Sequence, residues 1–109
     1  MNEVRINGKI TKNGITLKFA PSGMAIGTFS ISRSWKKKDS DKWESEFFNV
    51  KMFGKAAENV ANVTGKVVIE GYLKQERWKK ADKEFSQVWI IANTVTPENP
   101  APAEDDIPF

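Results

Sequence analysis

Short stretches in which apolar and polar residues alternate constrain the fold of this chain more than any other feature. In residues 4–10, Val4, Ile6 and Ile10 fall on one side of an extended backbone, and polar side chains fall on the other. Turn signals such as Asn13-Gly14 separate these stretches. The sequence therefore predicts strands over residues 4–19 (one interrupted strand), 24–34, 46–53, 66–78 and 85–95.

One segment has the period of a helix instead. Between residues 54 and 63 the apolar side chains form a single stripe, and Gly65 suits the end of a helix. Gly27, inside the second predicted strand, allows the bend that a small barrel needs. We therefore expect a mainly all-β fold, a five-stranded OB-fold barrel with one short helix after the third strand. A generic α+β domain is the alternative.

Residues 97–109 differ in composition from the rest of the chain. They contain four of the five prolines and four of the 14 acidic residues. Regular structure is unfavourable in a segment so rich in proline. The sequence thus predicts an OB-fold domain over residues 1–96 and a disordered linker with an acidic tip over residues 97–109.

The charge of the predicted domain points to a polyanionic partner. The whole chain has a net charge of +3, with 17 basic and 14 acidic residues. Because four of the acids follow residue 96, residues 1–96 keep 17 basic and 10 acidic side chains, a net charge of +7. A basic surface attracts polyanions, although the same charge would also serve solubility.

The composition argues against several other functions. The chain has no cysteine and no histidine, which excludes disulfides, thiolate catalysis and Cys/His zinc sites and removes the commonest general base. It also lacks a GxxxxGK[ST] loop and a GxSxG elbow. We therefore expect no enzymatic activity, no cofactor and no metal. Because no secretory signal or long apolar run is visible, we expect a cytoplasmic, nucleoid-associated protein with no membrane partner.

Two tryptophans lie beside clustered cations. Trp35 directly precedes a lysine triplet, and Trp78 lies between Arg77 and Lys79. Aromatic rings that stack on bases, together with cations that follow the backbone, are what sequence-independent binding of a single strand requires. The triplet consists of Lys36, Lys37 and Lys38.

Other aromatic residues divide between this surface and the core. Phe47 and Phe53 flank Lys51 on one face of a predicted strand. Trp43, in a charged segment, either stacks on a base or covers a hairpin. The residues expected in the core are Phe19, Phe29, Phe48 and Trp89.

Four segments of the chain together resemble the bacterial single-stranded DNA-binding protein family. The resemblance covers essentially all of residues 1–96 and the last six residues. The segments are Arg33-Ser34-Trp35-Lys36, Phe53-Gly54-Lys55-Ala56-Ala57-Glu58, Val68-Ile69-Glu70-Gly71-Tyr72-Leu73 and Asp105-Asp106-Ile107-Pro108-Phe109.

The resemblance implies sequence-nonspecific binding and protection of single-stranded DNA in replication, recombination and repair. It implies base stacking at four aromatic positions, of which Phe47 is often tryptophan in the family. With Trp43 added from its charged surroundings, the expected stacking residues are Trp35, Trp43, Phe47, Phe53 and Trp78.

The resemblance also implies phosphate contacts from Lys55, Lys74 and Arg77. Glu76 departs from the family, because its position is often basic. With the cations that adjoin the aromatic residues, the expected phosphate-binding residues are Lys36, Lys37, Lys38, Lys51, Lys55, Lys74, Arg77 and Lys79.

Assembly and protein partners follow from the same resemblance. The family usually forms homotetramers, with a dimer as the alternative for this chain. In the family, the acidic tip binds replication, recombination and repair proteins at basic sites with an apolar base on those proteins. The linker before the tip is usually much longer than residues 97–103. The expected docking residues are Asp105, Asp106, Ile107, Pro108 and Phe109.

Three other functions compete with this interpretation. An RNA-binding, cold-shock-like module would use the same stacking chemistry, since stacking does not test the 2′-hydroxyl. A primosomal adaptor of the same fold would bind partners more than DNA, but such relatives lack the acidic tip. A hydrolytic enzyme is disfavoured by the missing histidine, cysteine and motifs.

Overall fold

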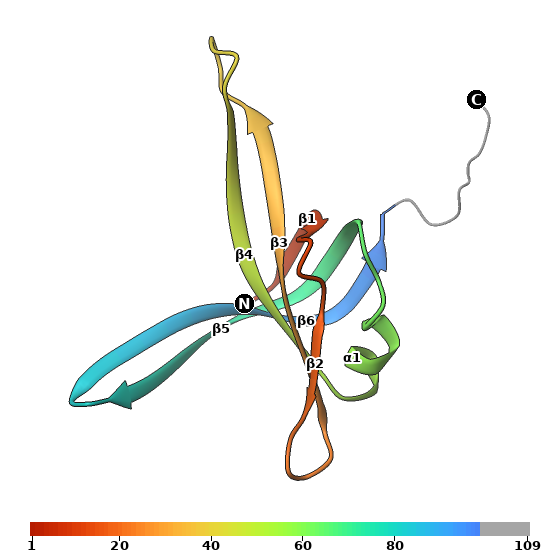
Figure 1. The fold of residues 1–109 in the computed structure, drawn as a ribbon, viewed down its shortest axis with the longest axis vertical. Helices are drawn as coiled ribbons and strands as arrows, with labels where there is room; N and C mark the ends of the chain where they lie inside the picture. Colours follow the sequence, from red (N-terminus) through yellow and green to blue (C-terminus); the bar gives the residue numbers. More distant parts are fainter. Residues whose placement is uncertain (99–109) are drawn as a thin grey trace.

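The computed structural model describes residues 1–98, which form six strands and one short helix (Figure 1). The strands form a single sheet in the order β1-β5-β6-β4-β3-β2. In chain order the elements are β1 (Val4–Ile10), β2 (Thr16–Phe19), β3 (Ala25–Lys36), β4 (Trp43–Phe53), α1 (Gly54–Val60), β5 (Lys66–Lys80) and β6 (Lys83–Pro97).

The sheet closes into a barrel because β1 pairs with two strands. It runs antiparallel to β5 over Val4 to Lys9, and its last two residues pair with Ser32 and Ile31 of β3. The expected five-stranded OB-fold barrel with one helix after the third strand is therefore confirmed, with β1 and β2 together taking the place of the interrupted first strand. Within residues 1–98, no helix is long and apolar enough to span a membrane.

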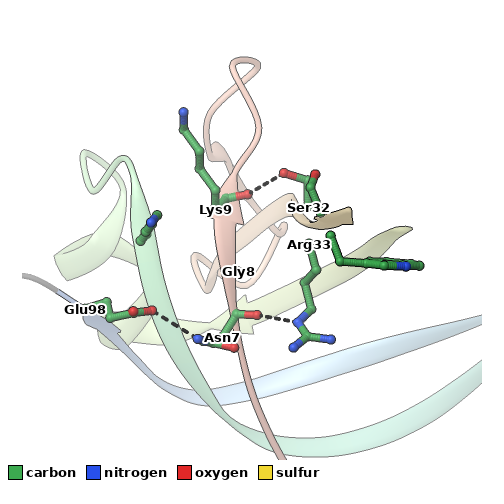
Figure 2. Close-up of a pocket in the computed structure, with 9 residues that line it drawn as sticks. Asn7, Gly8, Lys9, Ser32, Arg33 and Glu98 are labelled. Carbon is green, nitrogen blue, oxygen red and sulfur yellow. Dashed lines mark hydrogen bonds between the residues drawn. The ribbon is translucent and has the colours of Figure 1, made fainter. Parts of the chain in front are cut away.

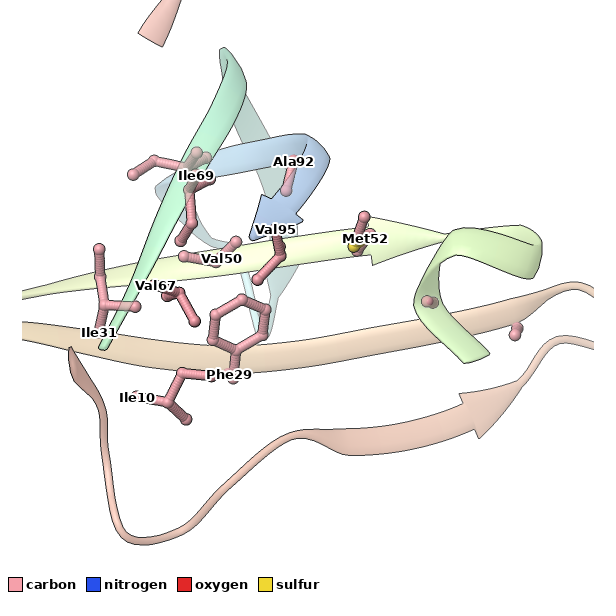
Figure 3. Close-up of a cluster of buried hydrophobic side chains, with 12 residues drawn as sticks. Ile10, Phe29, Ile31, Val50, Met52, Val67, Ile69, Ala92 and Val95 are labelled. Carbon is pink, nitrogen blue, oxygen red and sulfur yellow. The ribbon is translucent and has the colours of Figure 1, made fainter. Parts of the chain in front are cut away.

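Buried side chains from five of the strands and from the helix fill the barrel (Figure 3). Ile31, Val50, Val67 and Ile69 are completely buried, and Ala57 of α1 is completely buried in the same cluster. Phe29 is buried as expected, and Phe48 is partly buried against the core.

Two aromatic residues that were expected in the core lie outside it. Phe19, the last residue of the edge strand β2, is 60% exposed, because it lies at the far end of the β2–β3 hairpin. Trp89 precedes the core residue Ile90 on β6, and successive side chains of a strand point to opposite faces. Trp89 therefore points away from the barrel interior.

Two hairpins extend far beyond the barrel in different directions (Figure 1). We call residues 33–46 the β3–β4 arm and residues 73–90 the β5–β6 arm. The strands of both arms are longer than the sequence predicts: β3 and β4 leave only residues 37–42 between them, and β5 and β6 leave only Ala81 and Asp82. Both of these turn residues have positive φ angles, 52° and 64°, as a two-residue type I′ hairpin turn requires.

The β5–β6 pair bends at Gly71 where it leaves the barrel. The register shifts between Glu70 and Gly71, as expected for a β-bulge. A Cβ atom on Gly71 would overlap the carbonyl oxygen of Ile91 on β6. Only glycine therefore fits here without a shift of the backbone.

The helix is shorter than the sequence predicts. It ends at Val60 instead of residue 63, and the amide of Val63 donates to the carbonyl oxygen of Val60 in the turn that follows. Gly65, with a φ of 84°, then leads the chain into β5.

Candidate nucleic-acid interface

One face of β4 carries a row of open aromatic rings. Trp43, Phe47, Lys51 and Phe53 are an even number of residues apart, so they share a face, while Phe48, Val50 and Met52 point to the other side. Trp43 is 67% exposed and Phe47 is 64% exposed. The β3 residues opposite this row are mostly small and hydroxylated, so they leave the rings uncovered: Thr28, Ser30, Ser32 and Ser34.

The β5–β6 arm carries a stacked aromatic pair. Trp78 lies opposite Phe85, and their ring centroids are 5.8 Å apart with 19° between the planes. Lys74 lies on the same face, opposite Trp89. Arg77 and Lys79 alternate with Trp78 and point to the other side of the strand.

The cations of this arm nevertheless lie close to its rings. A groove of about 540 Å³ on the arm is lined by Arg77 and Lys79 as well as by Trp78 and Phe85. A chain that follows this groove would therefore meet aromatic faces and positive charge together.

The aromatic faces of the two arms meet at Lys51. Strands β4 and β6 pair in parallel there, with Val50 opposite Ile90 and Lys51 opposite Ile91. The Lys51 Nζ atom lies 4.4 Å from the centroid of the Trp89 ring, within cation–π distance. We call the combined face the aromatic surface; it consists of Trp43, Phe47, Phe53, Trp78, Phe85 and Trp89.

Two members of the aromatic surface, Phe85 and Trp89, are missing from the sequence-based site. The length of the β5–β6 turn is the signal that could have identified these two residues. With a two-residue turn at Ala81-Asp82, position 78 must face position 85, and position 74 must face position 89.

Trp35 lies on the opposite face of the β3–β4 arm from Phe47. It is four residues beyond the core residue Ile31, so it continues the barrel-facing side of β3, and it lies opposite Glu44. Its ring is 43% exposed. The structure therefore does not bring Trp35 together with the other four expected stacking residues.

Trp35 instead lines a separate basic pocket of about 560 Å³ between β1 and β3 (Figure 2). Three cations, Lys9, Arg33 and Lys66, also line this pocket, together with the acidic Glu98. Arg33 is fixed in place: its Nε donates to the carbonyl oxygen of Asn7 at 3.0 Å, and its Nη1 lies 3.0 Å from a carboxylate oxygen of Glu46.

The lysine triplet is exposed at the end of the β3–β4 arm. Lys36 lies opposite Trp43 and 3.6 Å from a carboxylate oxygen of Asp41, and Lys37 lies 3.9 Å from one of Glu44. Exposed pairs at such distances contribute little, so a phosphate can replace the carboxylates. The triplet thus extends the row of rings with exchangeable positive charge.

The remaining expected cations differ in their surroundings. Lys55 is exposed on α1, two residues after Phe53. Lys51, in contrast, is largely buried and lies 2.7 Å from a carboxylate oxygen of Glu76. The expected docking residues 105–109 lie outside the residues that the structure describes.

Comparison with known proteins identifies clear relatives. A model of the single-strand binding protein family matches residues 1–97. The single-stranded DNA-binding protein of Aquifex aeolicus is 39% identical, over 87% of this chain and 68% of its own length. That of Helicobacter hepaticus is 34% identical, over 99% of this chain and 67% of its own. That of Treponema pallidum is 32% identical, and this chain spans only 56% of its length.

Two solved structures share the fold at low sequence identity. A Plasmodium falciparum SSB in complex with ssDNA matches with a TM-score of 0.68 and 17% identity, over 87% of this chain and 90% of that one. The single-stranded DNA-binding protein of Thermus aquaticus matches with a TM-score of 0.76 and 21% identity, over 93% of this chain and 52% of that one.

Proposed function

The chain belongs to the single-strand binding protein family, and we propose that it binds and protects single-stranded DNA without sequence preference in replication, recombination and repair. The binding is non-catalytic. Bases stack on aromatic rings, and lysine and arginine side chains contact the phosphates.

The observation that carries this proposal is the aromatic surface. Five of its six rings are exposed and Trp89 is half-buried, and together they lie over β4 and the β5–β6 arm, although a folding chain normally buries such large apolar groups. Every base has a π-face, so a row of open rings binds bases regardless of sequence. Cations at both ends of the row supply the contacts to phosphates.

We assign base stacking to Trp43, Phe47, Phe53 and Trp78, with Trp35 serving as a further stacking residue on the other face of its arm. A strand that contacts both faces must pass around the β3–β4 arm. The proposed phosphate-binding residues are Lys36, Lys37, Lys38, Lys51, Lys55, Lys74, Arg77 and Lys79.

We further propose that the protein acts as a homo-oligomer, with a tetramer favoured over a dimer. The proposed role of residues 105–109 is to recruit replication, recombination and repair proteins. Sedimentation with and without oligo-dT reports assembly and binding in the same experiment.

The test of the function compares two exposed phenylalanines. Phe47 is 64% exposed on the aromatic surface, and Phe19 is 60% exposed on β2, outside that surface. Titration of fluorescent oligo-dT should show that Phe47→Ala weakens binding by about 1–3 kcal/mol, the usual loss for one stacked base. Phe19→Ala should bind like the wild type.

Two results would contradict the proposal. One is equal binding by Phe47→Ala and Phe19→Ala, which would show that the aromatic surface is not where the strand lies. The other is a strong preference for oligo-U over oligo-dT of the same length, which would favour an RNA-binding module instead.

A further inference from the structure

Lys51 differs from every other basic residue of the proposed interface in how it is held. Its side chain is 15% exposed, the lowest value for either partner of any ion pair within residues 1–98. It lies 2.7 Å from Glu76 Oε2, and its ammonium group covers one side of the Trp89 ring. This cation therefore already has an anionic and an aromatic partner within the protein.

The position of the pair makes this contact relevant to DNA binding. Lys51 lies between Phe47 and Phe53 on β4, and Glu76 lies on the β5–β6 arm on the same face as Trp78. The pair thus bridges the two halves of the aromatic surface. A strand that crosses from one arm to the other has to pass over it.

The geometry points to competition between Glu76 and phosphate. A carboxylate at 2.7 Å offers Lys51 a short, charge-assisted hydrogen bond of the kind that a phosphate oxygen would offer. Salt screens this partly buried pair less than the exposed pairs of Lys36 and Lys37. A phosphate must therefore compete with Glu76 for Lys51, and the carboxylate of Glu76 remains as a negative charge beside the strand.

We propose that Glu76 is an internal competitor for the phosphate site of Lys51, and that it lowers both the affinity for single-stranded DNA and the salt dependence of binding. This inference rests on the proposed function. It gives a physical role to an acid at a position expected to be basic. Glu76 neutralises Lys51 in the free protein, so the centre of the interface binds bases more strongly than phosphates.

The first test is Glu76→Gln in the full-length chain, titrated with oligo-dT at several salt concentrations. Freeing Lys51 should tighten binding at low salt on the order of tenfold, about one charge-assisted contact. The slope of log affinity against log salt should become steeper by about 0.7, the value for one more neutralised phosphate on a single strand.

A matched control separates this effect from a general gain in positive charge. Glu58 is exposed on α1, and none of the ion pairs within residues 1–98 includes it. Glu58→Gln changes the net charge by the same amount and should leave the slope near that of the wild type. Equal slopes for Glu76→Gln, Glu58→Gln and the wild type would overturn the inference.

A second variant tests whether Glu76 acts through Lys51. Adding Lys51→Met to Glu76→Gln should remove both the gain in affinity and the increase in slope that Glu76→Gln produces, because the freed cation is gone. If the gain persists without Lys51, Glu76 acts by repelling the strand directly, and the inference is wrong. If thermal melting shows that this double variant does not fold, Lys51→Arg combined with Glu76→Gln replaces it.

Arginine keeps the positive charge at position 51, so this variant should keep the gain in affinity and the steeper slope. Loss of that gain would count against the inference.

These outcomes are distinct from failure of the proposed function. If wild-type protein does not bind oligo-dT, the function itself is wrong. If the wild type binds and Glu76→Gln binds with the same affinity and slope, only the role of Glu76 is wrong.

Discussion

The ring of Trp78 stacks on that of Phe85 across the β5–β6 arm, with the centroids 5.8 Å apart. Both rings remain more than 40% exposed, and the arm that carries them extends beyond the barrel (Figure 1). The pair therefore contributes little to the core. We expect this contact to restrict the indole of Trp78 and so to lower the entropy that the side chain would lose in the proposed stacking on a base.

Trp78→Ala should weaken binding of oligo-dT by about 1–3 kcal/mol while the melting temperature changes little. Phe85→Ala should cost less, because it removes the support for Trp78 but leaves the indole available to a base. Fluorescence titration and thermal melting of both variants measure the two effects. A large fall in the melting temperature of Trp78→Ala, with normal binding by the folded protein, would show that Trp78 is structural.

Trp35 and Phe47 should act independently, because they lie on opposite faces of the β3–β4 arm and pair with different residues, Glu44 and Ser32. The losses of binding free energy in Trp35→Ala and Phe47→Ala should add in the double variant to within about 0.5 kcal/mol. The measurement is a double-mutant cycle with an oligo-dT long enough to reach both faces. With a short oligonucleotide only one of the two substitutions should matter. A strong coupling between them would place the two rings on a single site.

Gly71→Ala should destabilise the domain more than any other glycine-to-alanine change in its strands. The new Cβ would overlap the carbonyl oxygen of Ile91, so the bulge must shift, at a cost of about 1–3 kcal/mol or more. Gly27→Ala is the control, because its Cβ would come no closer than 3.4 Å to the Cβ of Ala57. Urea denaturation of both variants gives the comparison, and equal stabilities would contradict the bulge geometry.

The barrel could be predicted from the sequence because each of its strands has one buried face. Phe29 and Ile31 alternate with Thr28 and Ser30, which is the pattern of a half-buried strand. The sequence predicts strands that are too short in the two arms, for the opposite reason. Residues 33–36 and 43–46 are mostly exposed on both faces, so no hydrophobic alternation marks them as strand.

The candidate site divides in the same way. The face on which Trp35 lies follows from counting along β3 from Ile31. It can therefore be predicted from the sequence once β3 is taken to extend as far as Trp35. The contact of Lys51 with Glu76 could not be predicted from the sequence, because the two residues are 25 positions apart on β4 and β5. Strand β6 brings these strands together, since it pairs in parallel with β4 and antiparallel with β5. Such a contact depends on how the barrel closes, which local patterns do not report.

The proposed docking segment, residues 105–109, should be separable from DNA binding. It combines two acidic residues, Asp105 and Asp106, with two apolar ones, Ile107 and Phe109, and Pro108 restricts the free peptide and lowers the entropy lost on docking. About ten extended residues reach at most ~35 Å, so we expect the acidic pair to compete locally with phosphates for the basic surface of residues 1–96. Removing residues 105–109 should therefore leave the fold intact and keep or tighten the binding of oligo-dT at low salt.

Phe109→Ala should abolish capture of replication or repair enzymes while the affinity for oligo-dT stays at the wild-type value, because the substitution empties an apolar pocket on the partner and changes no charge. The experiment is a pull-down from bacterial extract beside a DNA titration, with wild type, Phe109→Ala and Phe109→Trp. The tryptophan variant keeps a large apolar ring and should retain part of the capture. Identical partners for wild type and Phe109→Ala would remove the docking role from this segment, whereas loss of DNA binding in the same variant would place Phe109 in the interface itself.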